Sequence, residues 1–372
     1  MRSGRGASDN LQPSKERTVQ NATFVLVLGA FSFLLIGWGF RSLPEEKWQI
    51  AFAAPAAKLD SGVWRSTNYT YYGAFQALAL LVSGSLFYVL VGALDVSLPP
   101  AVAGSLVAAF VVVCFGSSRV LARVVEKKPH TSTIGGAFFA GLIAAPWLIA
   151  AANRVAVAGP GPGIPLPVMP VLGAATTAYA MGEGLGRLSC ISFGCCYGKP
   201  VSQLSPALRG FFSRHSFIFS GGTKKIAYEA GLDGTRVVPI QAITSVFLVL
   251  TSLAATYLFL DGFYSGAFLL STIASQLWRC FSETLRADYR GEGRVTAYQA
   301  MAAFAVPYAL LIWAVFPVDV QGRPDIAAGI AHLWSPAPIL ALQALATAIF
   351  IASGRSKVTE SFLTPYVRRD RV

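Results

Sequence analysis

The segment "GRLSCISFGCCYGKP", from Gly186 to Pro200, interrupts two of the most apolar parts of the chain. It contains Arg187, Lys199, three cysteines and three glycines. Charged side chains are costly inside a membrane unless they meet a partner or a polar cavity. The segment is therefore a candidate functional site of a membrane protein.

The composition is that of a polytopic membrane protein. Of 372 residues, 54% are hydrophobic and only 13% are charged, far from the usual balance of a soluble domain. Apolar runs of helix-spanning length recur along the chain, and they must be helices because the bilayer core offers no water to exposed backbone groups. We expect about nine spans, at 22–40, 71–94, 101–116, 133–152, 165–181, 239–260, 262–278, 300–316 and 337–353.

The runs and the polar interruptions divide the chain into four parts. These are a basic cytoplasmic tail (1–21), a first span with an extracytoplasmic loop (22–70), a membrane core (71–317) with a head inserted at about 200–238, and a last span with a basic tail (318–372). The formal charge of +12 indicates contact with anionic lipid rather than nucleic acid, because the chain is so apolar.

Charge and span count disagree about orientation. Counting spans from a cytoplasmic N-terminus places the basic segment 184–236 outside the cytoplasm, against the positive-inside rule. Either the count is off by one, or these cations remain outside because they hold something anionic. The same count puts the C-terminus outside, whereas its basic ending "RRDRV" favours the inside.

A second polar cluster, "WRCFSETLRADYRGEGR", follows an apolar run at 278–294. If the helix continues through it, Arg279, Glu283, Arg286 and Arg290 lie on one face, with Glu283 bridging Arg279 and Arg286. The planar arginine fork suits a phosphodiester. The alternative is an interfacial helix end whose arginines extend to lipid headgroups.

The cysteines do not have the spacing of a metal site. Cys190, Cys195 and Cys196 follow C-x4-C-C, which is unlike zinc-ribbon spacing, and no histidine lies within the motif. A disulfide, a packing role or a nucleophilic thiol remain open for them. We therefore predict no metal and no cofactor.

Several motifs together resemble the bacterial prolipoprotein diacylglyceryl transferase family. The family signature G-R-[LI]-G-N-F-x-N-G-E-x-x-G-[RK] is similar to 186–199, with its conserved ends at Gly186, Arg187, Gly198 and Lys199. Other family motifs have counterparts in the same order, and the resemblance covers roughly 71–316. The counterparts are Tyr72-Gly73, "GSSR" ending at Arg119, "IGGAFFAGLI" from Ile134, "VPIQ" ending at Gln241, the Arg279, Glu283 and Arg286 set, and Gln299.

The resemblance implies a fold and an activity. The expected fold is an all-α polytopic membrane protein with the family's seven-helix core, a small extracytoplasmic head, and one extra span at each end. The expected reaction moves a diacylglyceryl group from phosphatidylglycerol to the lipobox cysteine thiol of a prolipoprotein signal peptide, or, in a divergent relative, to another acceptor. The protein would be a monomer in the bacterial inner (plasma) membrane, with its active face extracytoplasmic.

The resemblance also implies roles for individual residues. Arg187 and Arg279 would grip the phosphate and stabilise charge on the leaving group, and Glu283 would orient Arg279. Arg286 would add to the positive field. Glycines at two positions would let the loop approach the headgroup. The further substrate-binding candidates are Tyr72, Arg119, Gly194, Gly198, Lys199, Gln241 and Gln299.

This chain also departs from the family pattern where proton-transfer groups are expected. The family's two asparagines, its motif glutamate, its two histidines and its Tyr-Glu pair fall on Cys190, Phe193, Cys195, Ile134, Val238 and Ile243-Thr244. A thiol attacks as the thiolate, with an ordinary pKa of about 8.5, so a missing base leaves the chemistry unsupported. Two alternatives therefore stay open: a non-catalytic binder or transporter of anionic phospholipid, and a thiol-redox or metal protein.

Overall fold

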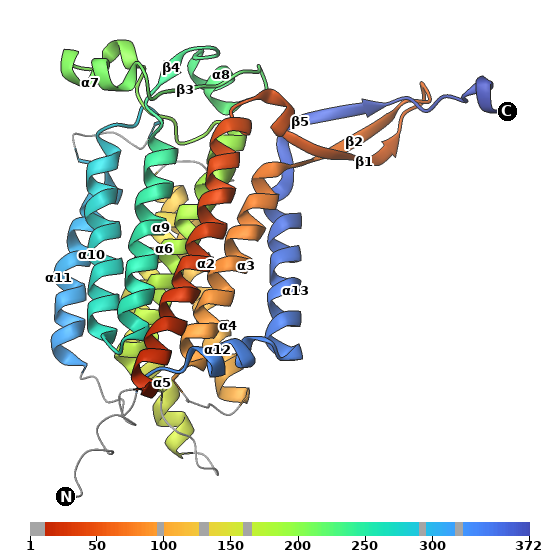
Figure 1. Cartoon of the computed structure of the whole chain (residues 1–372). Helices are drawn as coiled ribbons and strands as arrows, with labels where there is room; N and C mark the ends of the chain where they lie inside the picture. The colour runs from red at the N-terminus through yellow and green to blue at the C-terminus, as the bar shows by residue number, and fades with distance from the viewer. Residues whose placement is uncertain (1–11, 95–99, 126–133, 159–165, 290–294, 317–322) are drawn as a thin grey trace, which may run out of the picture.

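The structure is a computed structural model, and it describes residues 12–94, 100–125, 134–158, 166–289, 295–316 and 323–372. The chain is mostly helical, at 71%. A bundle of long helices carries a cap of short elements at one end (Figure 1). Its long helices are α2 (Gln12–Ser42), α3 (Tyr71–Gly92), α4 (Pro100–Val125), α5 (Ile134–Ala158), α6 (Val168–Phe193), α9 (Ile240–Leu260), α10 (Tyr264–Glu283), α11 (Ala297–Val315) and α13 (Pro336–Gly354).

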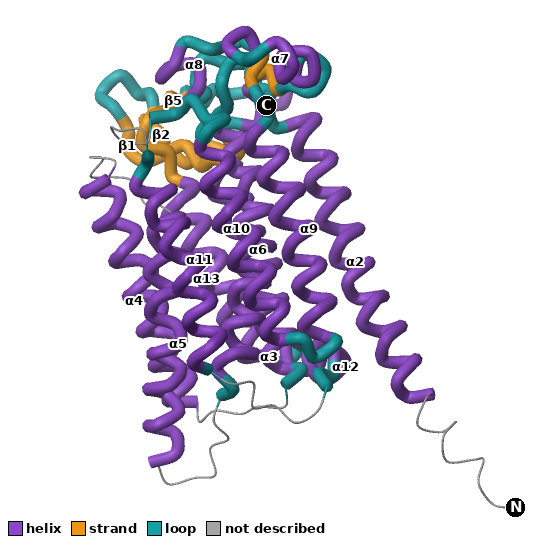
Figure 2. Tube along the Cα trace, turned by 90° about the vertical axis from the view of Figure 1, so that its left-hand side faces the viewer, coloured by secondary structure: helices purple, strands orange, loops and turns teal. Residues whose placement is uncertain are grey.

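Each apolar run expected from the sequence overlaps one of these helices. Within the described residues, six helices are long and apolar enough to cross a membrane, namely α2, α3, α5, α9, α11 and α13. This is the make-up of a multi-pass membrane protein. The other three long helices, α4, α6 and α10, run alongside them in the bundle (Figure 2).

Helix α6 is the centre of the bundle. It packs against α3, α9 and α10, and nearly all of its side chains are buried. Hydrogen bonds between helices reinforce this packing: the Ser252 hydroxyl donates to the Thr177 carbonyl oxygen at 2.7 Å, and the Ser271 hydroxyl to the Thr176 hydroxyl at 2.7 Å. Because α6 is covered by protein, its polar residues face other side chains instead of lipid.

Strands join two parts of the chain that the sequence analysis kept separate. β1 (Ile50–Lys58) and β2 (Trp64–Thr70) form an antiparallel hairpin after the first helix, and β5 (Arg355–Leu363), which follows the last helix, pairs antiparallel with β2. The sheet order is β1-β2-β5. The expectation of an all-α chain is therefore incomplete.

The head lies at one end of the bundle, over the ends of α6, α9 and α10 (Figure 1). It contains α7 (Pro206–Phe212), β3 (Phe217–Ile218), α8 (Lys225–Ala230) and β4 (Arg236–Val237), with β3 and β4 paired antiparallel. The short helix α12 (Ile326–Leu333) lies at the other end. The C-terminal segment lies at the head end and α2 begins at the opposite end.

Two boundaries differ from expectation. α2 already begins at Gln12, so residues 12–21 of the expected tail are helical. α10 ends at Glu283 instead of continuing to Arg290, because the chain turns after Thr284 and forms a β-bridge between Arg286 and Gly198. The expected domain boundary at 317/318 and the helix end near Gly291 lie outside the described residues.

Candidate functional site

The site is built on one face of α6. Tyr179, Glu183 and Arg187 follow each other at steps of four, so their side chains lie above one another along the helix. Glu183 accepts hydrogen bonds from the Tyr179 hydroxyl and from Nη2 of Arg187. The carboxylate is only 5% exposed, so α6 carries a buried ion pair at its head-side end.

Arg279 reaches the same carboxylate from α10. Its Nη2 donates to Glu183 Oε1 at 2.7 Å and Oε2 at 2.8 Å, and to the Tyr179 hydroxyl at 3.0 Å. The structure therefore brings Arg187 and Arg279 together, with Glu183 between them. The sequence analysis assigned this orienting role to Glu283, whereas the hydrogen bonds that hold Arg279 in the structure go to Glu183 and Tyr179.

Glu283 and Arg286 form a neighbouring pair. Nη1 of Arg286 lies 3.8 Å from Glu283 Oε1, and both side chains are buried. Arg286 is held mainly by Asp288, to which its Nε and Nη2 donate at 2.8 Å each. Glu283 thus has the looser ion pair of the two buried glutamates. A carboxylate held this loosely keeps oxygen lone pairs available for another partner.

A small polar pocket opens between these groups. It is lined by Glu183, Arg187, Thr244, Leu248, Ser275, Trp278, Arg279, Ser282, Glu283 and Arg286. Its enclosed space, ≈ 10 Å³, holds about one water molecule. The Nε atoms of Arg187 and Arg279 are buried without a hydrogen-bond partner. Two guanidinium groups sharing one carboxylate leave a positive charge and spare donors at this place.

Two neighbours fix the position of Arg279. A Cβ added at Gly135, near the start of α5, would lie 2.3 Å from Nη1 of Arg279, so a larger residue here would displace the guanidinium group. Phe138, one turn further along α5, stacks on Tyr179 with ring centroids 4.0 Å apart. Helix α5 therefore closes the third side of the cluster. This gives "IGGAFFAGLI" a structural role that its sequence alone did not indicate.

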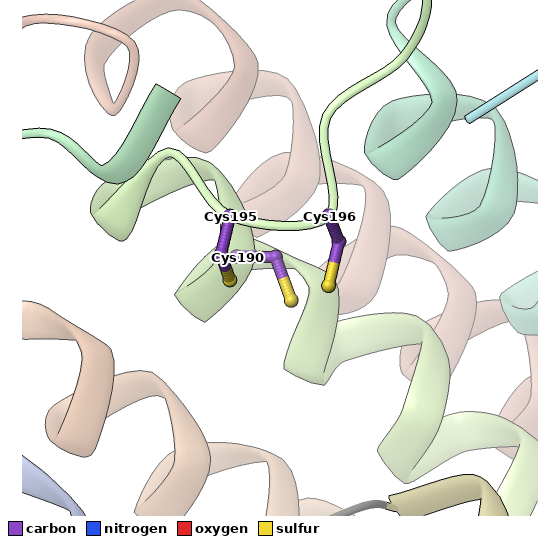
Figure 3. A group of neighbouring side chains, drawn as sticks. All are labelled: Cys190, Cys195 and Cys196. Carbon is purple, nitrogen blue, oxygen red and sulfur yellow. The ribbon is translucent and has the colours of Figure 1, made fainter. Parts of the chain in front are cut away.

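The three cysteines come together at the end of α6. Gly194 ends the helix in a left-handed conformation, with φ 71°, and turns the chain back over the last turn. Figure 3 shows the Cys190, Cys195 and Cys196 side chains side by side, pointing in about the same direction, and their Sγ atoms all lie within 4.8 Å of each other. Of these residues Cys190 is buried and Cys196 is half-buried.

The loop that carries the thiols is held on several sides. The Gln241 side-chain amide donates to the Cys195 carbonyl oxygen at 2.9 Å, and the Cys195 backbone N–H donates to the Cys190 carbonyl oxygen at 3.0 Å. The Lys199 amide donates to the Leu285 carbonyl oxygen at 2.9 Å. Cys196 has φ 57°, a conformation that costs a non-glycine residue about 1–2 kcal/mol. The surrounding contacts keep the loop in this shape.

Other predicted site residues have structural partners. A Cβ on Gly198 would lie 2.3 Å from the Val238 carbonyl oxygen, so this glycine permits contact between backbones, and Gly194 packs on Lys224. Gln299 completes a capping box with Thr296 at the start of α11. At these three positions the structure shows packing and capping, and their expected substrate-binding role stays a prediction.

Two further candidates lie at different distances from the pocket. Tyr72 packs edge-on against Phe193, with ring centroids 5.7 Å apart, close to the three thiols and to Arg187. Arg119 is exposed on α4 and is not part of the pocket lining. Tyr72 therefore stays a site candidate, and Arg119 stands apart from the cluster.

Lys224 is a buried lysine in the head. Its ammonium group donates to the carbonyl oxygens of Leu43 at 3.0 Å and Ser192 at 2.7 Å, at the ends of α2 and α6. Burial lowers its pKa to about 8, against a smaller opposing effect of Glu46. Lys224 thus joins two helix ends whose last carbonyl groups need donors.

Sequence reasoning missed Glu183 and Tyr179. It counted Glu183 only among the charges of the polar segment and ended the expected span at 181. The signal was present: Tyr179, Glu183 and Arg187 recur at i, i+4 and i+8 in "YAMGEGLGR". No protein-family model and no curated protein matches this chain, so the function is argued from the site itself.

Proposed function

We propose that this protein binds the phosphate of phosphatidylglycerol at Arg187 and Arg279 and transfers the diacylglyceryl group to the lipobox cysteine thiol of a prolipoprotein. The observation that carries the proposal is the convergence of these two arginines, from α6 and α10, on Glu183. The resemblance to the diacylglyceryl transferase family supplied the reaction. The geometry of the charged cluster supports the phosphate grip.

The charge and the free donors of the cluster suit a phosphodiester. Arg187 and Arg279 share one carboxylate, Glu183, which leaves one positive charge on the three residues. Their two buried Nε groups are unpartnered donors, and a buried donor without an acceptor costs about 1–3 kcal/mol. An anionic oxygen placed beside Glu183 would satisfy both and match the charge.

In the proposed reaction, the thiolate sulfur of the acceptor attacks the carbon of the diacylglycerol unit that is bonded to the phosphate oxygen. A C–S bond forms, the C–O bond to phosphate breaks, and glycerol phosphate leaves with one additional negative charge. Arg187 and Arg279 stabilise that developing charge. The thiol proton passes to Glu283, the buried carboxylate of the pocket with the looser ion pair. Tyr72 lies near Arg187 and the three cysteines.

A second candidate is an anionic-phospholipid binder or transporter without catalysis. It is favoured by the small size of the enclosed space and by the bonds that already join both guanidinium groups to Glu183. Only the transferase needs a proton acceptor, so the two differ at Glu283. Binding with no glycerol phosphate release would identify the non-catalytic protein.

The direct test uses the full chain in nanodiscs containing phosphatidylglycerol and a peptide with one lipobox cysteine. We expect glycerol phosphate release and a peptide heavier by one diacylglyceryl group. Arg187→Lys keeps the charge but loses the planar fork, so we expect release to fall at least tenfold. Arg214→Ala, an exposed head arginine, is the matched control. Wild-type protein that binds the lipid and releases nothing refutes the transferase.

The proposal also specifies the membrane arrangement: the seven long helices from α3 to α11 form the core, α2 and α13 are the extra spans, and the head faces outside the cytoplasm in a bacterial inner membrane. The concentration of basic residues at the head end weighs against this orientation. Those in the head segment are Lys199, Arg209, Arg214, Lys224, Lys225 and Arg236.

Orientation is measurable in cells. A cysteine introduced at exposed Gly210 in the head should react with a membrane-impermeant maleimide added to intact cells or spheroplasts, using a background in which the native cysteines have been shown not to react. Labelling supports the proposed orientation. Protection until the membrane is opened refutes the lipoprotein transferase, because its acceptors are modified outside the cytoplasm.

A further inference from the structure

The three-thiol cluster at the end of α6 lies beside the proposed phosphate site. Cys190 and Cys196 are near enough to Arg187 to interact electrostatically, and Cys196 also to Arg286. The cluster consists of thiols alone: among the described residues it includes no histidine or carboxylate. It therefore offers three soft ligands of one kind.

The geometry suits a tetrahedral ion with three protein ligands. Zinc–thiolate bonds are about 2.3 Å, which places sulfur atoms about 3.8 Å apart around the ion. The three Sγ atoms already lie within 4.8 Å of one another. Side-chain movements of about an ångström or less would close the site. The sequence spacing did not indicate this, because the left-handed turns at Gly194 and Cys196 fold Cys195 and Cys196 back toward Cys190.

The surroundings suit the charge of such a site. Three thiolates and Zn²⁺ carry one negative charge, and a fourth thiolate makes it two. Arg187, Arg286 and Lys225 all interact with the cysteines electrostatically and would balance that charge. Gln241 fixes the Cys195 carbonyl oxygen, as an outer partner that orients a ligand loop does in known metal sites.

We propose that Cys190, Cys195 and Cys196 bind Zn²⁺ as thiolates and leave its fourth position open for the acceptor cysteine thiol. This inference rests on the proposed transferase function. Coordination to zinc deprotonates a thiol, so the acceptor sulfur would become a bound thiolate as its proton passes to Glu283, the acceptor named above. The sulfur then attacks the glycerol carbon while Arg187 and Arg279 hold the departing phosphate. Zinc would thus keep the acceptor sulfur ionised in a chain that lacks most of the family's proton-transfer residues.

The first test is metal content, measured on the full chain purified in detergent and equilibrated with Zn²⁺. We expect about one zinc per chain, and at least a tenfold loss of affinity in Cys190→Ser, Cys195→Ser and Cys196→Ser. Cys114→Ser, on α4 outside the cluster, is the matched control. Retained zinc in all three cluster variants overturns the site. So does a disulfide among these cysteines in the isolated protein, found by alkylation and mass spectrometry.

The second test examines the open position. Co²⁺ bound in place of Zn²⁺ should show thiolate-to-cobalt charge-transfer absorption, and adding a lipobox peptide should change the spectrum, whereas the same peptide with serine for cysteine should not. Binding of Co²⁺ with no response to the cysteine peptide overturns the open position. So does exclusive binding of Cu⁺.

The metal site and the transferase can fail separately. If a chelator removes the zinc and glycerol phosphate release continues unchanged, the zinc inference fails and the transferase stands. If zinc binds and the cysteine peptide changes the Co²⁺ spectrum but no diacylglyceryl group is transferred, the transferase fails and the metal site stands. Folding of each variant is checked by its thermal transition, so loss of metal is not confused with loss of structure.

Discussion

Replacing Glu183 by glutamine is the most direct test of the charged cluster. Glu183 is 5% exposed and accepts from Arg187, Arg279 and Tyr179. The Glu183→Gln amide has similar size but no charge, so two buried guanidinium groups lose their counter-ion. Breaking a buried ion pair by removing one partner costs about 3–5 kcal/mol. We expect the free energy of unfolding to fall by that amount.

The assay is equilibrium unfolding of the purified chain in mixed micelles, with denaturing detergent as the titrant. The matched control is Glu360→Gln, which breaks the exposed ion pair with Arg65 and should leave the midpoint within measurement error. Phosphatidylglycerol in the micelle should restore part of the lost stability of Glu183→Gln, because the arginines then bind the lipid phosphate. Equal stability of the two variants, or no response to the anionic lipid, would refute the reasoning.

Three further predictions follow from single positions. Gly135→Ala should lower glycerol phosphate release on the order of 10- to 100-fold, because its Cβ displaces the Arg279 guanidinium group. Gly198→Ala should lower the free energy of unfolding by about 1–3 kcal/mol, because its Cβ meets a backbone oxygen at 2.3 Å. Gly210→Ala, with nothing within 4 Å, is the control for both, and equal behaviour contradicts either prediction. Lys224 has a pKa of about 8 in the folded protein and 10.5 in the unfolded chain, so the unfolded chain binds more protons between these pH values. The free energy of unfolding should therefore rise by up to about 3 kcal/mol as the pH increases from 8 to 10.5. Unfolding titrations across that range should show no such rise in Lys224→Met, and an unchanged slope would contradict the assignment.

The long helices were predictable because lipid imposes a simple rule on them. Each apolar run of the sequence overlaps a helix, since the backbone inside a bilayer has few other ways to satisfy its hydrogen bonds. The rule does not set helix ends where protein replaces lipid. α6 continues past 181 through Glu183 and Arg187 because neighbouring helices bury it.

The site was predictable in part. The sequence placed Arg187 and Arg279 in two polar clusters, and the family resemblance implied that both grip one phosphate. It could not assign the partner: Glu183 is not on the helix that carries Arg279, and Glu283, four residues away on α10, was the nearer choice. The thiol cluster depends on a positive φ at Cys196, which the residue type does not favour.

The sequence gives no clear indication of the β-sheet, because β1 lacks a strand pattern and β2 pairs with a distant segment. The segment "IAFAAPAAK" of β1 lacks the alternation of polar and apolar residues that marks a half-exposed strand. Its partner arrangement also depends on β5, which lies at the far end of the chain and pairs with β2. Contacts between distant segments follow from the packing of the whole bundle.

That sheet connects the N-terminal and C-terminal parts of the chain through the pairing of β2 with β5. β5 is hydrogen-bonded to β2, and directly below it the backbones of Gly354 and Gly73 touch, so that a Cβ on Gly73 would lie 2.2 Å from the Gly354 Cα. Trimming the protein to 71–317 would uncover this glycine contact and remove all three strands. The outer helices are therefore part of what holds α3, and with it Tyr72, in place.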